Sequence, residues 1–295
     1  MSLATLQARI EHAGGNQLDR IRKQKWKSFR AALKNNYNSR FIRCIETNQC
    51  CRALINSDSL KSDYDKKVIS VDFAMNMNSG DTFECLDDSS YWMIYLPELT
   101  EIAYLRAEII RCRYQVTIGN NDYWIYFQGP TETALRWNNK DSLNWNDLNL
   151  SGTIYIKQTS ETLEYFNRFT KIKLAGHTWQ VKVVDSITVP GIIELEVQEY
   201  FDSITEDIVE ATEITPLEND IKIIGESKVY PYDTYSYSTD VVGGTFSIDS
   251  DNAKIVSQNN GKCKIEIVSG RSGKFTLVYT TSDEIYELPI QILSL

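Results

Sequence analysis

The sequence predicts a mainly β protein that begins with short helices, continues as a β-barrel-like core and ends in a two-sheet β-sandwich. Apolar residues recur at helical spacing up to about residue 34, and the period changes to two from about Phe41. Closely spaced hairpin signals follow from about residue 221. With 295 residues, of which 42% are apolar, the chain has room for two or three folded domains. We place their boundaries at 1–43, 44–212 and 213–295.

The N-terminal 43 residues predict a basic helical arm. Apolar residues at helical spacing indicate a first helix up to Gly14-Gly15, and Asn16 is a plausible N-cap for a second helix over about 17–34. The apolar stripe of the second helix consists of Leu18, Ile21, Trp26, Phe29 and Leu33. Residues 1–43 carry ten basic and two acidic side chains, although the whole chain has a net charge of −9. This asymmetry indicates an arm that docks on an acidic partner, with a solvated helix face as the alternative.

The candidate partner-binding residues lie on the polar side of the second helix. They are Arg20, Arg22, Lys23, Lys25, Lys27, Arg30 and Lys34. If docking is electrostatic, it weakens with salt, because exposed charges are screened within about 10 Å at 0.1 M.

Residues 44–212 predict a β core with a weak internal repeat. The segment from Gly80 resembles the segment from Lys171, with Trp92 opposite Trp179 in a strand, turn, Trp-containing strand and second strand. This pattern predicts either two small barrels or one duplicated sheet system built from related hairpin units. An Asn- and Asp-rich loop between the two segments contains Trp137 and Trp145, which either pack on the core or form a contact surface.

The last 75 residues predict a sandwich. Gly243-Gly244 and Asn260-Gly261 are turn signals between strand-like segments, and about seven strands in this length is the number found in immunoglobulin-like sandwiches. The candidate surface-binding aromatics of this module are Tyr230, Tyr232, Tyr235 and Tyr237. Alternation puts Tyr235 and Tyr237 on one face, so a core role for that pair is the alternative.

The sequence offers no motif for catalysis, metal binding or a cofactor. Its two histidines, His12 and His177, have no supporting triad pattern, and phosphate-loop, dinucleotide and zinc-peptidase motifs are absent. Six cysteines without a CxxC pair favour folding in a reducing cytoplasm. The opening residues lack the apolar run of a secretory signal, and no stretch approaches the length of a membrane span. A carboxylate-pair glycosidase, which leaves no local signature, is the remaining enzyme class. Its nominal acid pairs are Asp87-Asp88, Glu98/Glu101 and Glu206/Asp207.

Two resemblances add to these observations. Residues 221–295, with GGTFSIDSDNAKIV and NGKCKIEIVSG, resemble the bacterial immunoglobulin-like domains that are appended to phage structural proteins and cell-surface proteins. Residues 1–200, with GDTFECLDDSSYWMIYLPELTEIAYLRAEIIRC and WQVKVVDSITVPGIIELEVQEY, are similar to head-closure or neck proteins of tailed bacteriophages.

The second resemblance implies a structural virion protein of the head-to-tail connector. Such a protein forms a homo-oligomeric ring, 12- or 6-fold, between portal and tail, helps to close the head and retain DNA, and is made in the host bacterial cytoplasm. Its expected partners are portal or adaptor and tail proteins, with packaged DNA as an additional contact and no membrane. The alternative is a glycan- or host-surface-binding tail or decoration protein that uses the immunoglobulin-like module.

Overall fold

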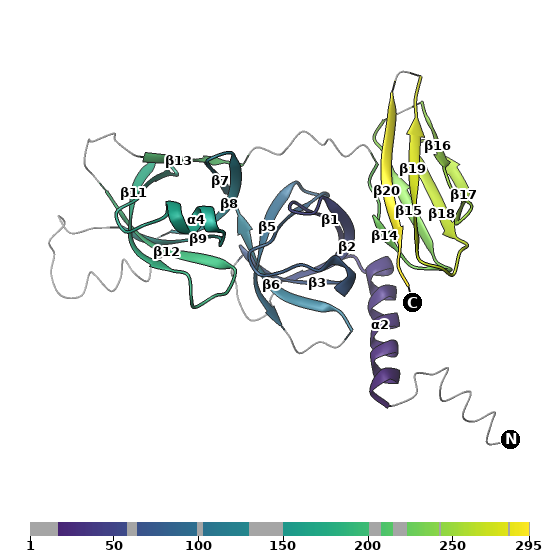
Figure 1. Cartoon of the computed structure of the whole chain (residues 1–295), viewed down its shortest axis with the longest axis horizontal. Coiled ribbons are helices and arrows are strands. Elements are labelled where there is room, and N and C mark those ends of the chain that lie inside the picture. The colour runs from purple at the N-terminus through teal and green to yellow at the C-terminus, as the bar shows by residue number, and fades with distance from the viewer. Residues whose placement is uncertain are drawn as a thin grey trace.

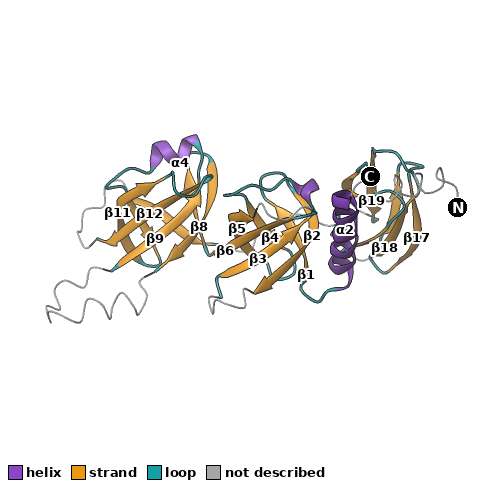
Figure 2. Cartoon of the chain, turned by 90° about the horizontal axis from the view of Figure 1, so that it is seen from below, coloured by secondary structure: helices purple, strands orange, loops and turns teal. Residues whose placement is uncertain are grey.

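The computed structural model describes residues 17–57, 64–98, 103–129, 150–200, 208–214, 223–241, 243–282 and 284–294. The chain forms three β modules in a row, with one long helix between the first barrel and the C-terminal sandwich (Figure 1, Figure 2). The prediction of a mainly β protein with barrel-like closed sheets is therefore confirmed. None of the helices within the described residues is long and apolar enough to cross a membrane.

The first module is a closed six-stranded barrel. Its strands, in the order β1-β2-β3-β6-β5-β4, close through antiparallel pairing of β1 with β4. Alternate residues of each strand point inward, among them Ile42, Ile69, Phe83 and Ile109. The strands are β1 (Ser39–Cys44), β2 (Gln49–Ser57), β3 (Lys66–Val71), β4 (Thr82–Cys85), β5 (Ser90–Glu98) and β6 (Leu105–Cys112), with the 3-10 helix η1 (Phe73–Met75) between β3 and β4.

The second module is also a closed barrel, of seven strands. Its order is β10-β11-β12-β9-β8-β7-β13, so β13 is inserted between β7 and β10, where the first barrel closes directly. The strands are β7 (Tyr114–Ile118), β8 (Asn121–Gln128), β9 (Ser151–Lys157), β10 (Lys171–Leu174), β11 (His177–Asp185), β12 (Ile192–Glu199) and β13 (Ile208–Glu213), with the helix α4 (Ser160–Tyr165) between β9 and β10.

The two barrels are copies of one six-stranded plan. Apart from β13, the strand order of the second barrel repeats that of the first, and a helical turn follows the third strand in both. The register of β5 with β6 shifts between Ile94 and Leu96, and that of β11 with β12 shifts between Val181 and Val183. Trp92 and Trp179 lie two residues before these bulges, each 2% exposed. The sequence repeat therefore corresponds to two barrels and not to one sheet system.

The barrels are fused through a tight apolar interface. Arg113 alone separates β6 from β7. A methyl group on Gly80 of the first barrel would meet the backbone carbonyl of Gly191 in the second, so the backbones approach closely there. Lys157 of the second barrel also donates to Glu46 at 2.8 Å and to Asp81 at 2.7 Å in the first. The buried apolar side chains are Tyr91, Met93, Ile110, Cys112, Tyr126, Tyr155, Val189 and Ile192.

The third module consists of two sheets that share one core. Sheet order is β14-β20-β19-β16 in one and β15-β18-β17 in the other. Asn260 and Gly261 join β17 to β18 with φ values of 45° and 72°, as expected for the hairpin that this dipeptide predicts. The strands are β14 (Lys228–Val229), β15 (Thr234–Ser238), β16 (Thr245–Ile248), β17 (Ala253–Asn259), β18 (Lys262–Ile267), β19 (Gly273–Thr280) and β20 (Ile285–Ile292).

The predicted helical arm corresponds to α2 (Gln17–Asn35), and the first predicted helix lies outside the described residues. The boundaries predicted after residues 43 and 212 fall within β1 and β13, and need correction. The first is misplaced because a turn at Asn36 ends the helix, and its carbonyl already accepts the Ser39 N–H at 3.0 Å. The second is misplaced because residues in the acidic stretch pair with β7 and β10 to close the second barrel.

Candidate interaction helix

The C-terminal half of α2 is anchored on the first barrel by aromatic packing. Phe29 is 5% exposed, and its ring stacks on Tyr104 with centroids 4.4 Å apart and an interplanar angle of 17°. One helical turn earlier, Trp26 meets the ring of Tyr230 edge-on at 5.1 Å. Tyr104 belongs to the first barrel and Tyr230 to the sandwich, so α2 joins both modules.

A charged clamp at Asp233 fixes α2 to the sandwich. Arg30 donates to Asp233 Oδ2 at 2.5 Å and to the Tyr235 hydroxyl at 2.6 Å, and Lys34 donates to Asp233 Oδ1 at 2.5 Å. The Arg30 guanidinium also lies 4.5 Å from the centre of the Tyr230 ring. Burial opposes ionisation of Asp233, but the hydrogen bonds from Lys34 and the Thr234 N–H, together with the charge of Arg30, outweigh it and lower the pKa of this carboxyl.

Two of the predicted partner-binding residues, Arg30 and Lys34, therefore dock on an acidic residue of this same chain. Their shared partner, Asp233, lies 199 or more residues away in the sequence, and no local pattern links it to the helix. The other five predicted residues, Arg20, Arg22, Lys23, Lys25 and Lys27, have exposed side chains.

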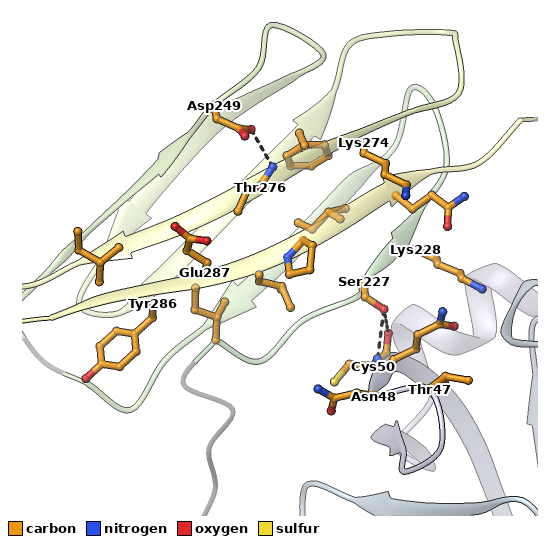
Figure 3. Close-up of a pocket in the computed structure, with 18 residues that line it drawn as sticks. Thr47, Asn48, Cys50, Ser227, Lys228, Asp249, Lys274, Thr276, Tyr286 and Glu287 are labelled. Atoms are coloured by element: carbon orange, nitrogen blue, oxygen red, sulfur yellow. Dashed lines mark hydrogen bonds between the residues drawn. The ribbon is translucent and has the colours of Figure 1, made fainter.

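A second group of contacts joins the sandwich directly to the first barrel. The Tyr230 hydroxyl lies 3.0 and 2.9 Å from the two carboxylate oxygens of Asp72, to which it donates. Ser227 donates its backbone N–H to the carbonyl of Cys50 at 3.0 Å, next to Lys228 in Figure 3, and Lys228 donates to the carbonyl of Ala74 at 2.5 Å.

A half-buried carboxyl lies beside these contacts. Glu226 is 3.7 Å from Arg52 of the first barrel. Burial raises the pKa of Glu226 to about 7, although the positive charges of Arg52, Arg30 and Lys34 oppose the shift. Docking of the sandwich therefore places an ionisable group with a near-neutral pKa at the junction.

The same junction borders a groove between the sandwich and the first barrel (Figure 3). Its cavity volume is about 830 Å³, with β19 and β20 on one side and residues 47–50, at the turn into β2, on the other. Thr276 on its wall donates its backbone N–H to Asp249 at 2.7 Å. Lys274 and Glu287 also line it, but the side chains labelled in Figure 3 do not converge on one point.

The N-terminal half of α2 extends past the sandwich and the neighbouring strands of the first barrel (Figure 1). Leu18 is 71% exposed and Ile21 is 39% exposed, although the sequence places both on the apolar stripe. Asp19 is the only acidic residue among the first turns. This half of α2 therefore presents apolar and basic side chains together.

The four predicted surface-binding tyrosines do not form one strip. Tyr235 and Tyr237 are 3% and 2% exposed in the sandwich core, which was the alternative for this pair. Tyr230 packs against α2 and Asp72. Tyr232 is 73% exposed, with a φ of 58°. The aromatic surface is therefore corrected to one exposed ring. The pleat of β15 turns Tyr235 and Tyr237 inward, whereas Tyr230 follows β14 and is covered by α2.

Among the candidate nucleophiles within the described residues, Cys50 lines the groove between the sandwich and the first barrel. Burial raises the pKa of Cys50 to about 11, and Cys51 points into the first barrel's core from the opposite side of β2. His177 is exposed, with Nδ1 2.6 Å from Glu199. Asp88 accepts hydrogen bonds from Ser90. All six cysteines of the chain are buried, and the described part contains no cluster of metal-ligating side chains.

Several other sequence candidates fall outside the described residues. They are His12, Trp137, Trp145, Glu101, Glu206 and Asp207, together with the side chain of Glu98.

The candidate site in the described chain is thus the helix α2. Its C-terminal half is fixed to the first barrel and the sandwich, and its N-terminal half is exposed. Comparison with protein-family models, curated proteins and solved structures finds no match for this chain.

Proposed function

We propose that this chain is a structural protein of the neck of a tailed bacteriophage, where copies form a ring between portal and tail. The observation that carries the proposal is α2, which is fixed to two modules at its C-terminal half and presents basic and apolar side chains at the other. Such a helix suits a rigid contact between neighbouring proteins, because its exposed half is already ordered before it binds.

The stiffness of the rest of the chain supports the same role. The two barrels are joined by one residue and by an apolar interface, and the sandwich is held by Asp72, Asp233 and the backbone of Cys50. In a head-closure (stopper) or adaptor-like subunit, this arrangement allows the barrels to make ring contacts while α2 engages a portal, adaptor or tail protein. It fits a virion component made in the host cytoplasm, with packaged DNA as a further acidic contact for the exposed basic residues.

The strand pairing of the last module supports its assignment as immunoglobulin-like. Its three- and four-stranded sheets share one core, and its first strand divides between them. Ile224 bridges to Ser238 of β15, whereas Lys228 pairs in parallel with Gln291 of β20. We assign this module a projecting, attaching role. The alternative of glycan binding depended on the tyrosine strip, of which one ring is exposed.

Cryo-electron microscopy of the intact particle that carries this chain tests the proposal. We expect a 12- or 6-fold ring at the portal–tail junction, with two barrels and one sandwich in each subunit. Density for this chain on the capsid shell or at the tail tip, or its absence from any particle, would contradict the neck assignment.

Charge reversal tests the role of α2 within that assignment. Changing Arg22, Lys23 and Lys27 to Glu is expected to block incorporation into particles, because exposed charges steer and orient protein contacts. A matched triple change at Lys254, Lys262 and Lys264 on exposed positions of the sandwich controls for net charge. Normal incorporation of the α2 variant would remove the helix from the assembly interface.

A further inference from the structure

A groove runs between α2 and the first barrel on the side away from the sandwich. Its volume is about 390 Å³, and Ile21, Gln24, Ser28, Leu54 and Tyr104 are among its lining residues. Leu54 and Tyr104 form a partly apolar floor, and one face of α2 forms the wall. Side chains of another protein can therefore enter beside the helix and not only cover its tip.

The groove lies on one outer face of the first barrel. The equivalent face of the second barrel is the one that packs against the first barrel. Leu54 pairs with Ser70, and Ser70 pairs with Arg106. At the same places in the second barrel, Tyr126 pairs with Tyr155, and Tyr155 pairs with Glu194. Counting two residues back along the last strand makes Tyr104 the equivalent of Ile192.

Tyr126, Tyr155 and Ile192 are buried against Tyr91 and Met93 of the first barrel. Within the described residues, the equivalent face of the first barrel contacts α2, whose one buried side chain is Phe29, and at Arg52 it also meets Glu226 of the sandwich. In the described part of the chain, this face is thus covered by a whole barrel in one copy, and by half of a helix with one contact from the sandwich in the other.

The charges beside the groove restrict what can fill it. Arg20, Arg22 and Lys23 are exposed on the turns next to Ile21, and Lys25 lines the groove itself. A second copy of α2 would bring the same positive charges together, so pairing between two such helices is opposed by repulsion. Nucleic acid matches the charge, but a phosphate backbone has no apolar stripe for Leu54 and Ile21 to contact.

We propose that this groove binds an amphipathic helix with an acidic polar face, supplied by a neighbouring protein. Its apolar stripe lies against Ile21, Leu54 and Tyr104, and its carboxylates face the exposed basic side chains next to Ile21, among them Arg20, as in other helix-in-groove contacts. The proposal rests on the neck function, since it specifies the chemistry of the portal, adaptor or tail surface that meets α2.

Fluorescence anisotropy with the full-length chain and labelled peptides of about five helical turns tests this inference. One peptide carries Leu at helical spacing and Glu elsewhere, and a second has the same composition with the apolar spacing scrambled. We expect the first peptide to bind at least about tenfold more tightly than the second, because only the first buries a continuous stripe.

Variants locate the binding site. Ile21→Asp is expected to weaken binding of the first peptide about tenfold or more, whereas Ile285→Asp, at an exposed apolar position on the sandwich, is expected to leave it unchanged. Circular dichroism and thermal unfolding verify that both variants fold.

Four results would overturn the inference. The first two are equal binding of the two peptides and unchanged binding by Ile21→Asp. The third is tighter binding of a DNA duplex that is insensitive to Ile21→Asp, which would assign the basic surface to nucleic acid. The fourth is peptide binding only after removal of residues 1–16, which would identify that segment as the occupant. Peptide binding does not depend on the chain's position in a particle, so it can fail or succeed independently of the microscopy.

Discussion

Replacing Asp233 with Asn removes one charge from the α2 clamp while keeping the shape of the side chain. Asp233 accepts hydrogen bonds at 2.5 Å from both Arg30 and Lys34. Hydrogen bonds to charged groups contribute about 1.5–3 kcal/mol when shielded from water. The Lys34 side chain is 39% exposed, so its share falls toward the about 0.5 kcal/mol of surface pairs. We expect D233N to weaken docking by about 2 kcal/mol, or about thirtyfold in the equilibrium.

Hydrogen–deuterium exchange measures this effect without requiring complete unfolding. Peptides that cover residues 17–35 report on α2, and peptides that cover 223–230 include the Ser227 N–H, which bonds to Cys50 across the junction. Both peptides are expected to exchange up to about thirtyfold faster in D233N. Local opening of the variant breaks weaker contacts to residue 233, so it costs less free energy and occurs more often. Asp251→Asn, at an exposed turn of the sandwich, is the matched control. If D233N exchanges like the control in both peptides, the clamp does not hold α2.

Three further substitutions test other parts of the molecule. Because burial raises the pKa of Glu226 to about 7, folding favours its protonated form; this stabilisation is present below the usual carboxyl pKa and is lost as pH rises through about 7. Glu226→Gln is therefore expected to flatten thermal stability between about pH 5 and 8, and an unchanged profile would contradict this. Gly191→Ala is expected to destabilise the barrel interface in thermal unfolding more than Gly176→Ala does, since both glycines have positive φ but only the first faces opposing backbone; equal losses would point to strain alone. Arg43→Met is expected to cost about 3–5 kcal/mol in urea unfolding, because it leaves the Glu84 carboxylate buried without its 2.6 Å partner; a loss below about 1 kcal/mol, typical of a surface pair, would refute this.

The sequence predicts the repeated barrel strands well because their side chains alternate. Trp92 and Trp179 mark the same position in each copy, and the residues that follow them alternate between the inside and the outside of the barrel up to the bulges, with Met93 on the outside buried against the second barrel. Barrel closure was harder to predict. β13 pairs in parallel with β10 and antiparallel with β7, so its role depends on partners that are distant in the sequence.

The apolar stripe and the basic face of α2 predict the candidate site only in part. The stripe on α2 correctly places Phe29 against the protein, but it does not tell how far the supporting surface extends, and Leu18 is left exposed. Likewise, the basic face predicts an acidic partner without showing that Arg30 and Lys34 find one in Asp233 of the same chain. Such contacts depend on how whole modules dock, which local spacing does not encode.

The single residue between β6 and β7 has a mechanical consequence. Arg113 leaves no length for a hinge, and rotation of one barrel against the other would separate the apolar side chains buried between them. The two barrels therefore move as one rigid body. A tilt imposed on α2 by whatever it contacts would be transmitted to the far end of the second barrel with its angle preserved.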